Sequence, residues 1–328
     1  MASRLNHRLR RIAAAAIFAL AGPSAALAAY PEKPIKLVVP YTPGGAADQL
    51  SRVLAEGLAR DLGQPVLVEN KPGANTMVAA TYVARAAPDG YTVFLSSNAS
   101  MVLNPMLYQR IAYDAARDFQ PLTIVAELPL VLVASNAVPA TNLAEFVAYA
   151  KARPGKLNYA SVGIGSPLQL AIELLKSRTG MDLTHVPYNG SAPALTSLMG
   201  NDTQLMADVV STSLPLVREH KLKALAVTTS ERLAVLPDVP TVAESGFPGF
   251  RAATWFGLAV PRAVPQADAQ RLQAAIDKVL RDPALRGRFE PLGLVIQAPR
   301  SQAQVDAYLQ EDRQRWGEVI EANKIKMD

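Results

Sequence analysis

The residues best suited to bind a ligand lie in short loops rich in Gly, Ser, Thr and Asn. The first such loop, residues 40–48 (PYTPGGAAD), contains two adjacent glycines and an acid. Adjacent glycines let the backbone approach a ligand closely, and the N–H groups that begin a helix carry partial positive charge, which suits a carboxylate. The alternative is a plain strand-to-helix turn whose acid favours the helix dipole. The ligand contacts that we expect from this loop are Tyr41, Thr42, Gly44, Gly45 and Asp48.

A second polar cluster follows the strand-like segment 91–96. Ser97 and Asn98 offer a hydroxyl and an amide, which can bind a ligand directly or through water. The alternative is ordinary turn chemistry. The loop 70–76 (NKPGANT) also leads into a helix and has the same two interpretations.

The second half of the chain repeats this arrangement. Residues 161–166 (SVGIGS) place glycine and serine at a helix entry, and residues 188–191 (YNGS) do so again. Ser166 also suits a helix N-cap, because Pro and Gln follow it at the first and third helical positions. Asp208 ends an apolar segment, where it could meet a ligand or only cap a turn. The candidate ligand residues of this half are Ser161, Gly163, Gly165, Ser166, Tyr188 and Asp208.

Several kinds of chemistry are excluded by composition. The chain has no Cys and three His, so disulfides, thiol nucleophiles, thiolate–metal sites and a His-rich metal cage cannot form. P-loop, nucleophile-elbow and zinc-protease motifs are also missing. A hydrolase would have to pair Ser161 or Ser166 with His185, whereas we expect His185 to be structural and His220 to be exposed. We expect no catalytic residue, no metal and no cofactor.

The N-terminus predicts export. Residues 1–28 combine four Arg without an acid, the short apolar run IAAAAIFALA and an Ala-Leu-Ala cleavage pattern ending at Ala28. Removing them changes the net charge from +5 to +1, so nothing favours nucleic acid as a partner. No other segment is apolar enough to span a bilayer. We therefore expect an exported protein, cleaved after Ala28 and not anchored in the membrane.

Alternating strands and helices must position these loops. The pattern predicts strands at 35–39, 66–69, 91–96, 129–134, 157–161, 183–186, 204–210, 222–228 and 255–260. It predicts helices at 46–62, 75–87, 142–152, 166–180, 191–200, 265–281 and 301–321. Two successive sets of this kind indicate two α/β domains, each with a mixed or mostly parallel sheet flanked by helices. The last helices have no sheet nearby, so we expect them to return to the first domain, with chain crossings near 126–131 and 250–256.

The order of these motifs resembles a known family. The segments YPEKPIKLVVPYTPGGAADQLSR, NKPGANT, PDGYTVFLSSN and YDAARDFQPLT are followed by YASVGIGSPLQL, VPYNGSAPAL, LKALAVTTSERLAVLPDVPTVAESGFPGF and WFGLAVP. Together they resemble the Bug family of extracytoplasmic solute receptors, which serve tripartite tricarboxylate transporters. The resemblance extends over almost the whole chain after residue 28.

The resemblance implies the two-lobed periplasmic binding protein fold, type II-like, with the ligand in the cleft. Lobe 1 would comprise residues 29–128 and 253–328, and lobe 2 residues 129–252. The ligand would be a small organic carboxylate held mostly by backbone groups, hydroxyls and water. The partners would be membrane transporter subunits, and we expect the receptor itself to be a monomer.

This chain departs from the family pattern at several places, of which Asn75 and positions 168–169 lie in loops near the expected cleft and bear on the identity of the ligand. The family usually has Gly where this chain has Asn75 and His220, and His where it has Leu168 or Gln169.

Two other functions stay open at this point. The same cleft could serve a receptor that signals to a membrane sensor kinase, and a periplasmic hydrolase is the less favoured third interpretation.

Overall fold

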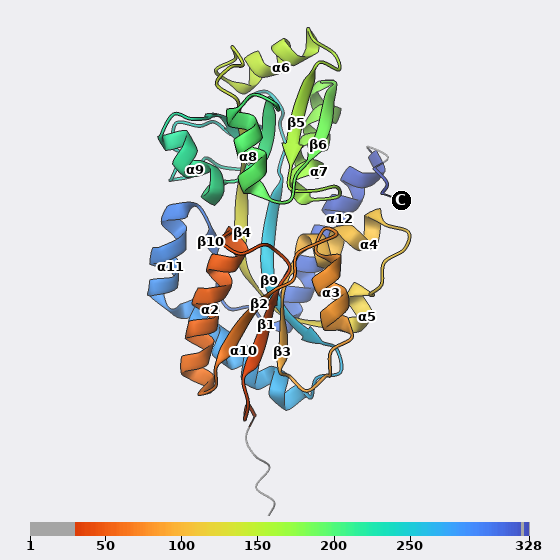
Figure 1. The fold of residues 1–328 in the computed structure, drawn as a ribbon, viewed down its shortest axis with the longest axis vertical. Helices are drawn as coiled ribbons and strands as arrows, with labels where there is room; N and C mark the ends of the chain where they lie inside the picture. Colours follow the sequence, from red (N-terminus) through yellow and green to blue (C-terminus); the bar gives the residue numbers. More distant parts are fainter. Residues whose placement is uncertain (1–29, 323–324, 328) are drawn as a thin grey trace, which may run out of the picture.

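The structure is a computed structural model that describes residues 30–322 and 325–327 (Figure 1). The predicted signal peptide and its cleavage site after Ala28 lie outside the described residues. Figure 1 shows two lobes stacked along the long axis, each with strands covered by helices. The predicted two-lobed α/β fold is therefore confirmed.

Lobe 1 is built on three parallel strands. Strand β1 pairs with β2 on one side and β3 on the other. Its strands are β1 (Ile35–Val39), β2 (Val66–Asn70) and β3 (Thr92–Ser97). Its helices from the first half of the chain are α2 (Ala46–Leu62), α3 (Met77–Ala84), the π-helix η1 (Ala99–Leu103), α4 (Asn104–Leu107) and α5 (Ala115–Asp118).

Lobe 2 repeats the design at the other end of the molecule. Strand β5 lies between β6 and β7 and runs parallel to both. Its strands are β5 (Leu157–Ser161), β6 (Leu183–Pro187), β7 (Leu205–Val209) and β8 (Lys223–Val227). Its helices are α6 (Leu143–Lys151), α7 (Pro167–Thr179), α8 (Ser191–Met199) and α9 (Val210–Arg218).

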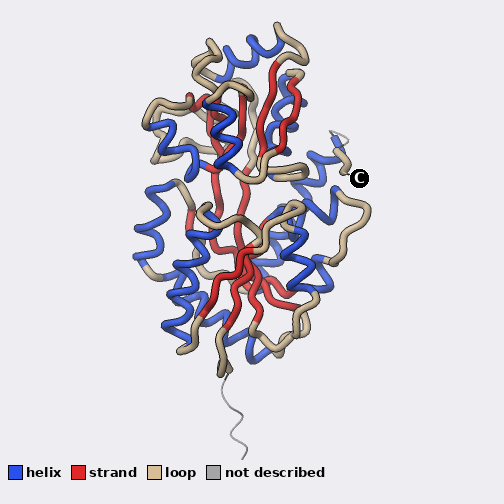
Figure 2. The backbone as a smooth tube through the Cα atoms, viewed as in Figure 1, coloured by secondary structure: helices blue, strands red, loops and turns tan. Residues whose placement is uncertain are grey.

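Two long strands join the lobes. Strand β4 (Phe119–Ala134) pairs antiparallel with β9 (Ala253–Pro261) up to Pro129, and its remaining residues pair with β7 and β8 of lobe 2. Figure 2 shows these strands running through the narrow region between the lobes. The predicted domain boundaries fall inside β4 and at the start of β9, and they stay a prediction.

The last elements pack against lobe 1. Arg271 of α10 donates to Asp61 of α2 at 2.6 Å, and Asp312 of α12 accepts from the Trp255 indole of β9 at 2.8 Å. These elements are α10 (Gln266–Arg281), α11 (Pro283–Phe289), the 3-10 helix η2 (Glu290–Leu292), β10 (Val295–Ile296) and α12 (Gln302–Ala322).

Local signals explain where several helices begin and end. Ser166 caps α7, with Pro167 as its first residue, and Gly180 closes it in the left-handed conformation. The Ser301–Gln304 pair forms a reciprocal capping box at α12, because each side chain accepts from the other residue's backbone N–H. The structure confirms these predicted boundaries. They could be predicted from the sequence because capping depends only on neighbouring residues.

The structure differs from the predicted elements in two ways. Strand β4 begins ten residues before the predicted segment 129–134, and seven short elements were not predicted: the π-helix η1, α4, α5, α9, α11, η2 and β10. The sheet is mixed, which is one of the two arrangements expected. Burial explains the first difference: most of β4 is enclosed on both faces, so it has no polar alternation to reveal its full length. Antiparallel pairing follows from the two strands that cross between lobes.

Both positions where the family pattern usually has Gly are left-handed here. Asn75 has φ of +46° and His220 has φ of +55°. Asn is the non-glycine residue that most readily adopts this conformation, so Asn75 can replace Gly at modest strain. His220 is exposed, as predicted.

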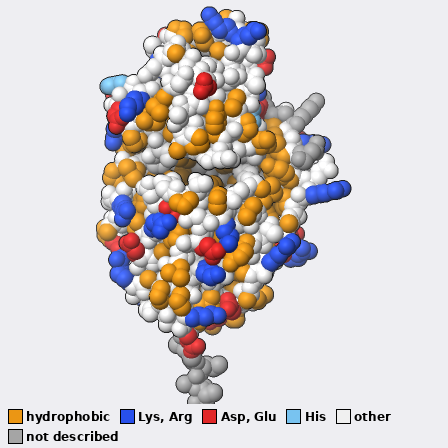
Figure 3. Space-filling model, viewed as in Figure 1, with side chains coloured by type: hydrophobic (Ala, Val, Ile, Leu, Met, Phe, Trp, Pro, Cys, Tyr) orange, Lys and Arg blue, Asp and Glu red, His pale blue; other side chains and the backbone are white. Residues whose placement is uncertain are grey.

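Figure 3 shows a furrow crossing the molecule between the lobes, with few charged side chains along its visible edges. Among the residues that the structure describes, none of the helices combines the length and apolar character that a bilayer span requires.

Candidate functional site

The loop between β1 and α2 is held by Asp48. Its carboxylate accepts the Gly44 N–H at 3.0 Å, the Arg52 guanidinium through two bonds of 3.0 Å, and the Asn70 amide at 3.1 Å. Burial would raise the pKa of Asp48, but the hydrogen bonds from Arg52, Gly44 and Asn70 hold it below its usual value. Asp48 is therefore ionised and turned toward its own loop.

This arrangement leaves the N-terminus of α2 open. Gly45 occupies the N-cap position and no side chain caps the first turn, while Thr42 and Gly44 are exposed. The backbone N–H groups of this turn have no intrahelical partner and carry the positive end of the helix dipole. An anion at this loop stays a prediction, and the structure shows that Asp48 holds the shape of the loop.

Behind this loop lie the other predicted residues of lobe 1. The Tyr41 hydroxyl donates to Ser97 Oγ at 3.2 Å, and the Tyr41 ring packs against Phe256 with centroids 5.5 Å apart. Burial raises the pKa of Tyr41 to about 12. Asn98 is fully buried and accepts from Thr254 Oγ1 at 2.7 Å. Ser97 and Asn98 thus connect the loop to the start of β9.

In lobe 2, Ser161 and His185 lie together. Ser161 Oγ is 2.6 Å from His185 Nε2, accepts the Gly163 N–H at 3.2 Å and lies 3.0 Å from the Gly163 carbonyl. A hydroxyl has one proton. All three contacts are satisfied only if Ser161 donates to the Gly163 carbonyl and His185 Nε2 donates to Ser161. His185 then orders the loop 161–166, and its Nε2 does not serve as a base.

This geometry bears on the hydrolase interpretation. The Ser161–His185 distance matches a nucleophile–base pair, but Ser161 is 0% exposed and Ser166 is 1% exposed. Burial lowers the pKa of His185, which keeps the ring neutral at pH 7. Tyr159 stacks on the ring with centroids 4.8 Å apart. The pair has the features of a structural contact, as predicted for His185.

Ser166 acts as the predicted N-cap. Its hydroxyl accepts the Gln169 N–H at 3.3 Å, and the Gln169 side chain accepts the Gly165 N–H at 2.7 Å. The Ser166 oxygen retains acceptor capacity for one more donor, and its proton has no acceptor among the residues that the structure describes. A ligand oxygen that approached this helix entry could accept that proton.

Asp208 has a different environment from the other predicted residues. It is fully buried and accepts from Ser191 Oγ at 2.6 Å, from Ser213 Oγ at 2.6 Å and from Thr212 Oγ1. Burial raises the pKa of Asp208, and the three hydroxyls only partly oppose this. The carboxylate ties the end of β7 to the beginnings of α8 and α9, so a ligand contact with Asp208 stays an untested prediction.

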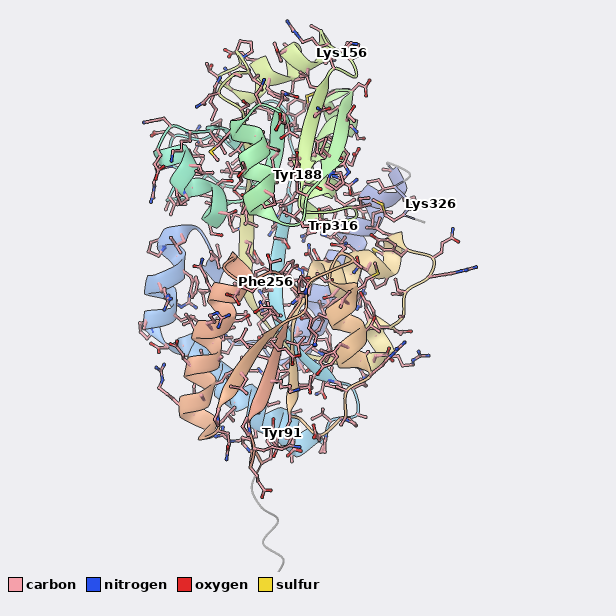
Figure 4. The ribbon with its side chains drawn as sticks, viewed as in Figure 1. Tyr91, Lys156, Tyr188, Phe256, Trp316 and Lys326 are labelled. Carbon is pink, nitrogen blue, oxygen red and sulfur yellow. The ribbon has the colours of Figure 1, made fainter. Side chains whose placement is uncertain are left out.

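The lobes meet at these loops. A Cβ atom at Gly190 would lie 3.9 Å from Thr42 Oγ1, which places the YNGS loop opposite the glycine loop. Tyr188 donates its backbone N–H to Ser161, and Figure 4 shows it at the edge of lobe 2 that faces Phe256 of lobe 1. The predicted loops of the two lobes therefore face each other, while Asp208 supports them from inside lobe 2.

Several residues near the site were not predicted. Asn104 and Tyr108 contact the loops 74–76 and 163–165, and Phe256 packs against Tyr41. Only the WFGLAVP motif gave a signal, for Phe256. No trio of Asp, Glu or His within residues 30–322 and 325–327 is arranged to hold a metal ion.

The chain matches one family over most of its length. Residues 50–325 match the family described as tripartite tricarboxylate transporter family receptor. Protein BugT of Bordetella pertussis is 35% identical over 324 residues, which cover 97% of this chain and 98% of that protein.

Two solved structures with bound carboxylates are similar in fold. Rpa4515 of R. palustris, solved with adipate, is 32% identical, with a TM-score of 0.87 over 91% of this chain and 99% of that one. MatC from Rhodopseudomonas palustris, solved with bound malate, is 35% identical, with a TM-score of 0.83 over 89% of this chain and 100% of that one.

Proposed function

This chain belongs to the tripartite tricarboxylate transporter receptor family of Bug-type solute-binding proteins, and we propose that it captures a small organic carboxylate between its lobes and delivers it to such a transporter. The uncapped N-terminus of α2 carries the proposal. It presents an exposed Thr-Pro-Gly-Gly backbone toward lobe 2, and Asp48 holds it in that shape.

Electrostatics favour a carboxylate held without a direct Arg partner. No Arg occurs in the cleft loops 40–48, 97–100, 161–166 or 188–191, and nearby Arg52 is already paired with Asp48. Helix N-termini would supply much of the stabilisation, about 0.3–1 kcal/mol each and up to about 2 kcal/mol when partly buried. Such a site should accept several carboxylates of similar size, with adipate and malate, seen in the relatives, as first probes.

The mechanism is a population shift. A ligand that contacts both lobes favours the closed state only by the contacts it gains there. The crossing strands β4 and β9 are the place where the lobes would pivot. No covalent step is required, and Ser161 and His185 serve to order the loop 161–166 rather than to catalyse a reaction.

A thermal-shift screen tests the carboxylate assignment. The mature chain, residues 29–328, is unfolded and refolded to remove bound ligand, then screened against mono-, di- and tricarboxylates, aromatic acids, amino acids and sugars. A ligand at 100 times its Kd adds about 2.7 kcal/mol to the stability of the folded state. A rise in Tm confined to carboxylates supports the proposal. A flat response to every carboxylate, with no acid found by mass spectrometry in the unstripped protein, contradicts it.

Delivery to a transporter requires a separate test. Deleting the gene should abolish uptake of the identified carboxylate, and deleting the transporter membrane subunits should have the same effect. A transcriptional response that persists without those subunits, with uptake unchanged, would instead favour a receptor for a sensor kinase. N-terminal sequencing of protein from the periplasm tests export and cleavage after Ala28.

A further inference from the structure

A second contact between the lobes lies beside the site, at Tyr108. The Tyr108 hydroxyl, from lobe 1, donates to the Ile164 carbonyl of lobe 2 at 3.2 Å. A Cβ atom at the next residue, Gly165, would lie 3.0 Å from the Tyr108 hydroxyl oxygen and 3.2 Å from Asn75 Nδ2. Two lobe 1 side chains therefore rest directly on the backbone of the loop 161–166.

The lobe 1 side of this contact is held under strain. Ala74, Asn75 and Thr76 are three consecutive non-glycine residues with φ between +43° and +73°. Non-glycine residues adopt this conformation at a cost, and such strain persists only where the surroundings enforce it. A strained turn that faces the other lobe is a candidate for a functional element.

Asn104 enforces the strained turn. Its side chain is fully buried, accepts from Asn75 Nδ2 at 2.8 Å and donates to the Asn75 carbonyl at 2.7 Å. Its own carbonyl accepts the Tyr108 N–H at 3.1 Å. One buried residue thus fixes both side chains that reach lobe 2.

Tyr108 is supported from its other side as well. Met327, near the end of the chain, donates its backbone N–H to the Leu107 carbonyl at 3.0 Å and forms a parallel bridge with Tyr108. Figure 1 shows α4 and this end of the chain beside the boundary between the lobes. Burial raises the pKa of Tyr108, so its hydroxyl stays a donor at ordinary pH.

We propose that Tyr108 is a positioning residue for ligand binding: with Asn75 it docks on Ile164 and Gly165 and thereby fixes how lobe 2 closes over the ligand. This inference rests on the proposed function, because it assumes that ligand binding requires closure. Because the contact joins atoms of different lobes, it would be lost if the lobes moved apart at this point. It therefore contributes to affinity without touching the ligand.

The test uses two substitutions that should each weaken binding alone and should partly compensate for each other when combined. Tyr108→Phe removes one hydrogen bond of the closed state and should weaken carboxylate binding by about two- to tenfold. Gly165→Ala adds a methyl group against the Tyr108 hydroxyl and should weaken binding by a similar factor. In the Gly165→Ala background, Tyr108→Phe removes the colliding oxygen, so it should restore part of the affinity.

A matched control separates closure from backbone strain. Gly180 ends α7, the helix that follows the loop 161–166. Its φ of +72° is close to the +76° of Gly165, and a Cβ atom at Gly180 would meet nothing within 4 Å. Gly180→Ala should lower Tm as any strained substitution does, but leave the Kd unchanged. Equal losses of affinity in Gly165→Ala and Gly180→Ala would overturn the proposal, as would a Tyr108→Phe effect of the same sign in both backgrounds.

Spin labels read closure without assuming which ligand binds. The chain has no Cys, so labels attach only at cysteines introduced for exposed Glu56 of α2 and exposed Lys151 of α6. Interlobe distances are measured on the protein as purified and at saturating carboxylate. Tyr108→Phe should widen the distribution in the wild-type background and narrow it in the Gly165→Ala background.

The outcomes distinguish the two proposals. If the stripped protein binds no carboxylate and the unstripped protein carries no acid, the proposed function fails, and the distances of the protein as purified still decide the role of Tyr108. If carboxylates bind but Tyr108→Phe changes neither the interlobe distances nor the affinities, only the closure proposal fails. A protein that shows no short interlobe distance under either condition also contradicts it.

Discussion

Removing the buried carboxylate of Asp208 should destabilise lobe 2, although Asp208 forms no salt bridge among the described residues. Asp208 is fully enclosed and receives three hydroxyl hydrogen bonds. Among the described residues, Ser213 Oγ donates only to Asp208 and is 0% exposed, whereas Thr212 also donates to the Val209 carbonyl. Asp208→Ala therefore leaves one hydroxyl buried without a partner.

The expected loss combines two opposing effects. An orphaned buried hydroxyl costs about 1–3 kcal/mol, and the small cavity adds to this. Removing a buried carboxylate whose pKa is raised returns part of its desolvation penalty. We expect a net loss of about 1–3 kcal/mol, or several degrees in Tm, at roughly 2–4 °C per kcal/mol for chains of 150–250 residues.

The pH dependence gives the sign of the electrostatic part. The native pKa of Asp208 is raised above the unfolded value of about 3.9, so between these two values the folded state holds more protons. Stability from this group is fully present below the unfolded pKa and is lost as pH rises through the native pKa. Asp208→Asn cannot titrate, so its stability relative to wild type should improve from pH 4 to pH 7.

Urea unfolding of wild type, Asp208→Ala and Asp208→Asn at several pH values measures both quantities. The alanine variant should lose more stability than the asparagine variant, whose amide can still pair with the hydroxyls. Two results would refute the reasoning: an alanine variant as stable as wild type at pH 7, or an asparagine variant whose relative stability falls as pH rises.

Three further predictions follow from the same contacts. Asp48→Ala and Gly44→Val should each weaken carboxylate binding in calorimetry, the first by freeing the glycine loop and the second because Gly44 has φ of +87° and its backbone must stay accessible; normal binding by both would place the site elsewhere. Gly257→Ala should lower the free energy of unfolding by about 1–3 kcal/mol in urea, because its Cβ would lie 2.6 Å from the Thr123 carbonyl oxygen in the adjacent strand; unchanged stability would contradict this. Ser166→Ala should cost about 0.5–2 kcal/mol of stability through the lost N-cap and should also weaken binding, whereas a stability loss with unchanged Kd would limit Ser166 to capping.

The features predicted correctly are those set by nearby residues. Ser166 caps α7 and Gly180 ends it because these effects depend on a few consecutive residues. The loop 40–48 was predicted as a helix entry with an open backbone. In the structure no side chain caps the first turn of α2, because the N-cap residue is Gly45. Apolar residues that recur every three or four positions likewise identify helices such as α2.

The features missed depend on residues far apart in the chain. Asn104 holds Asn75 across 29 positions, and Tyr108 reaches Ile164 across 56. The close approach of Ser161 and His185 was considered only for the disfavoured hydrolase, because it depends on the register of β5 against β6, which no local pattern specifies. The early start of β4 was hidden because a strand buried on both faces has no alternation.

The sequence by itself determined the alternating α/β pattern, the glycine and serine loops that lead into helices, and the exclusion of thiol chemistry, because each depends on residue type or on neighbours in the chain. Only the tertiary structure decided what the acids do. Asp48 and Asp208 remain candidate ligand contacts, and the structure adds that one carboxylate holds the glycine loop and the other holds three hydroxyls inside lobe 2. The role of a carboxylate depends on which donors surround it in space, and those donors come together only when the chain folds.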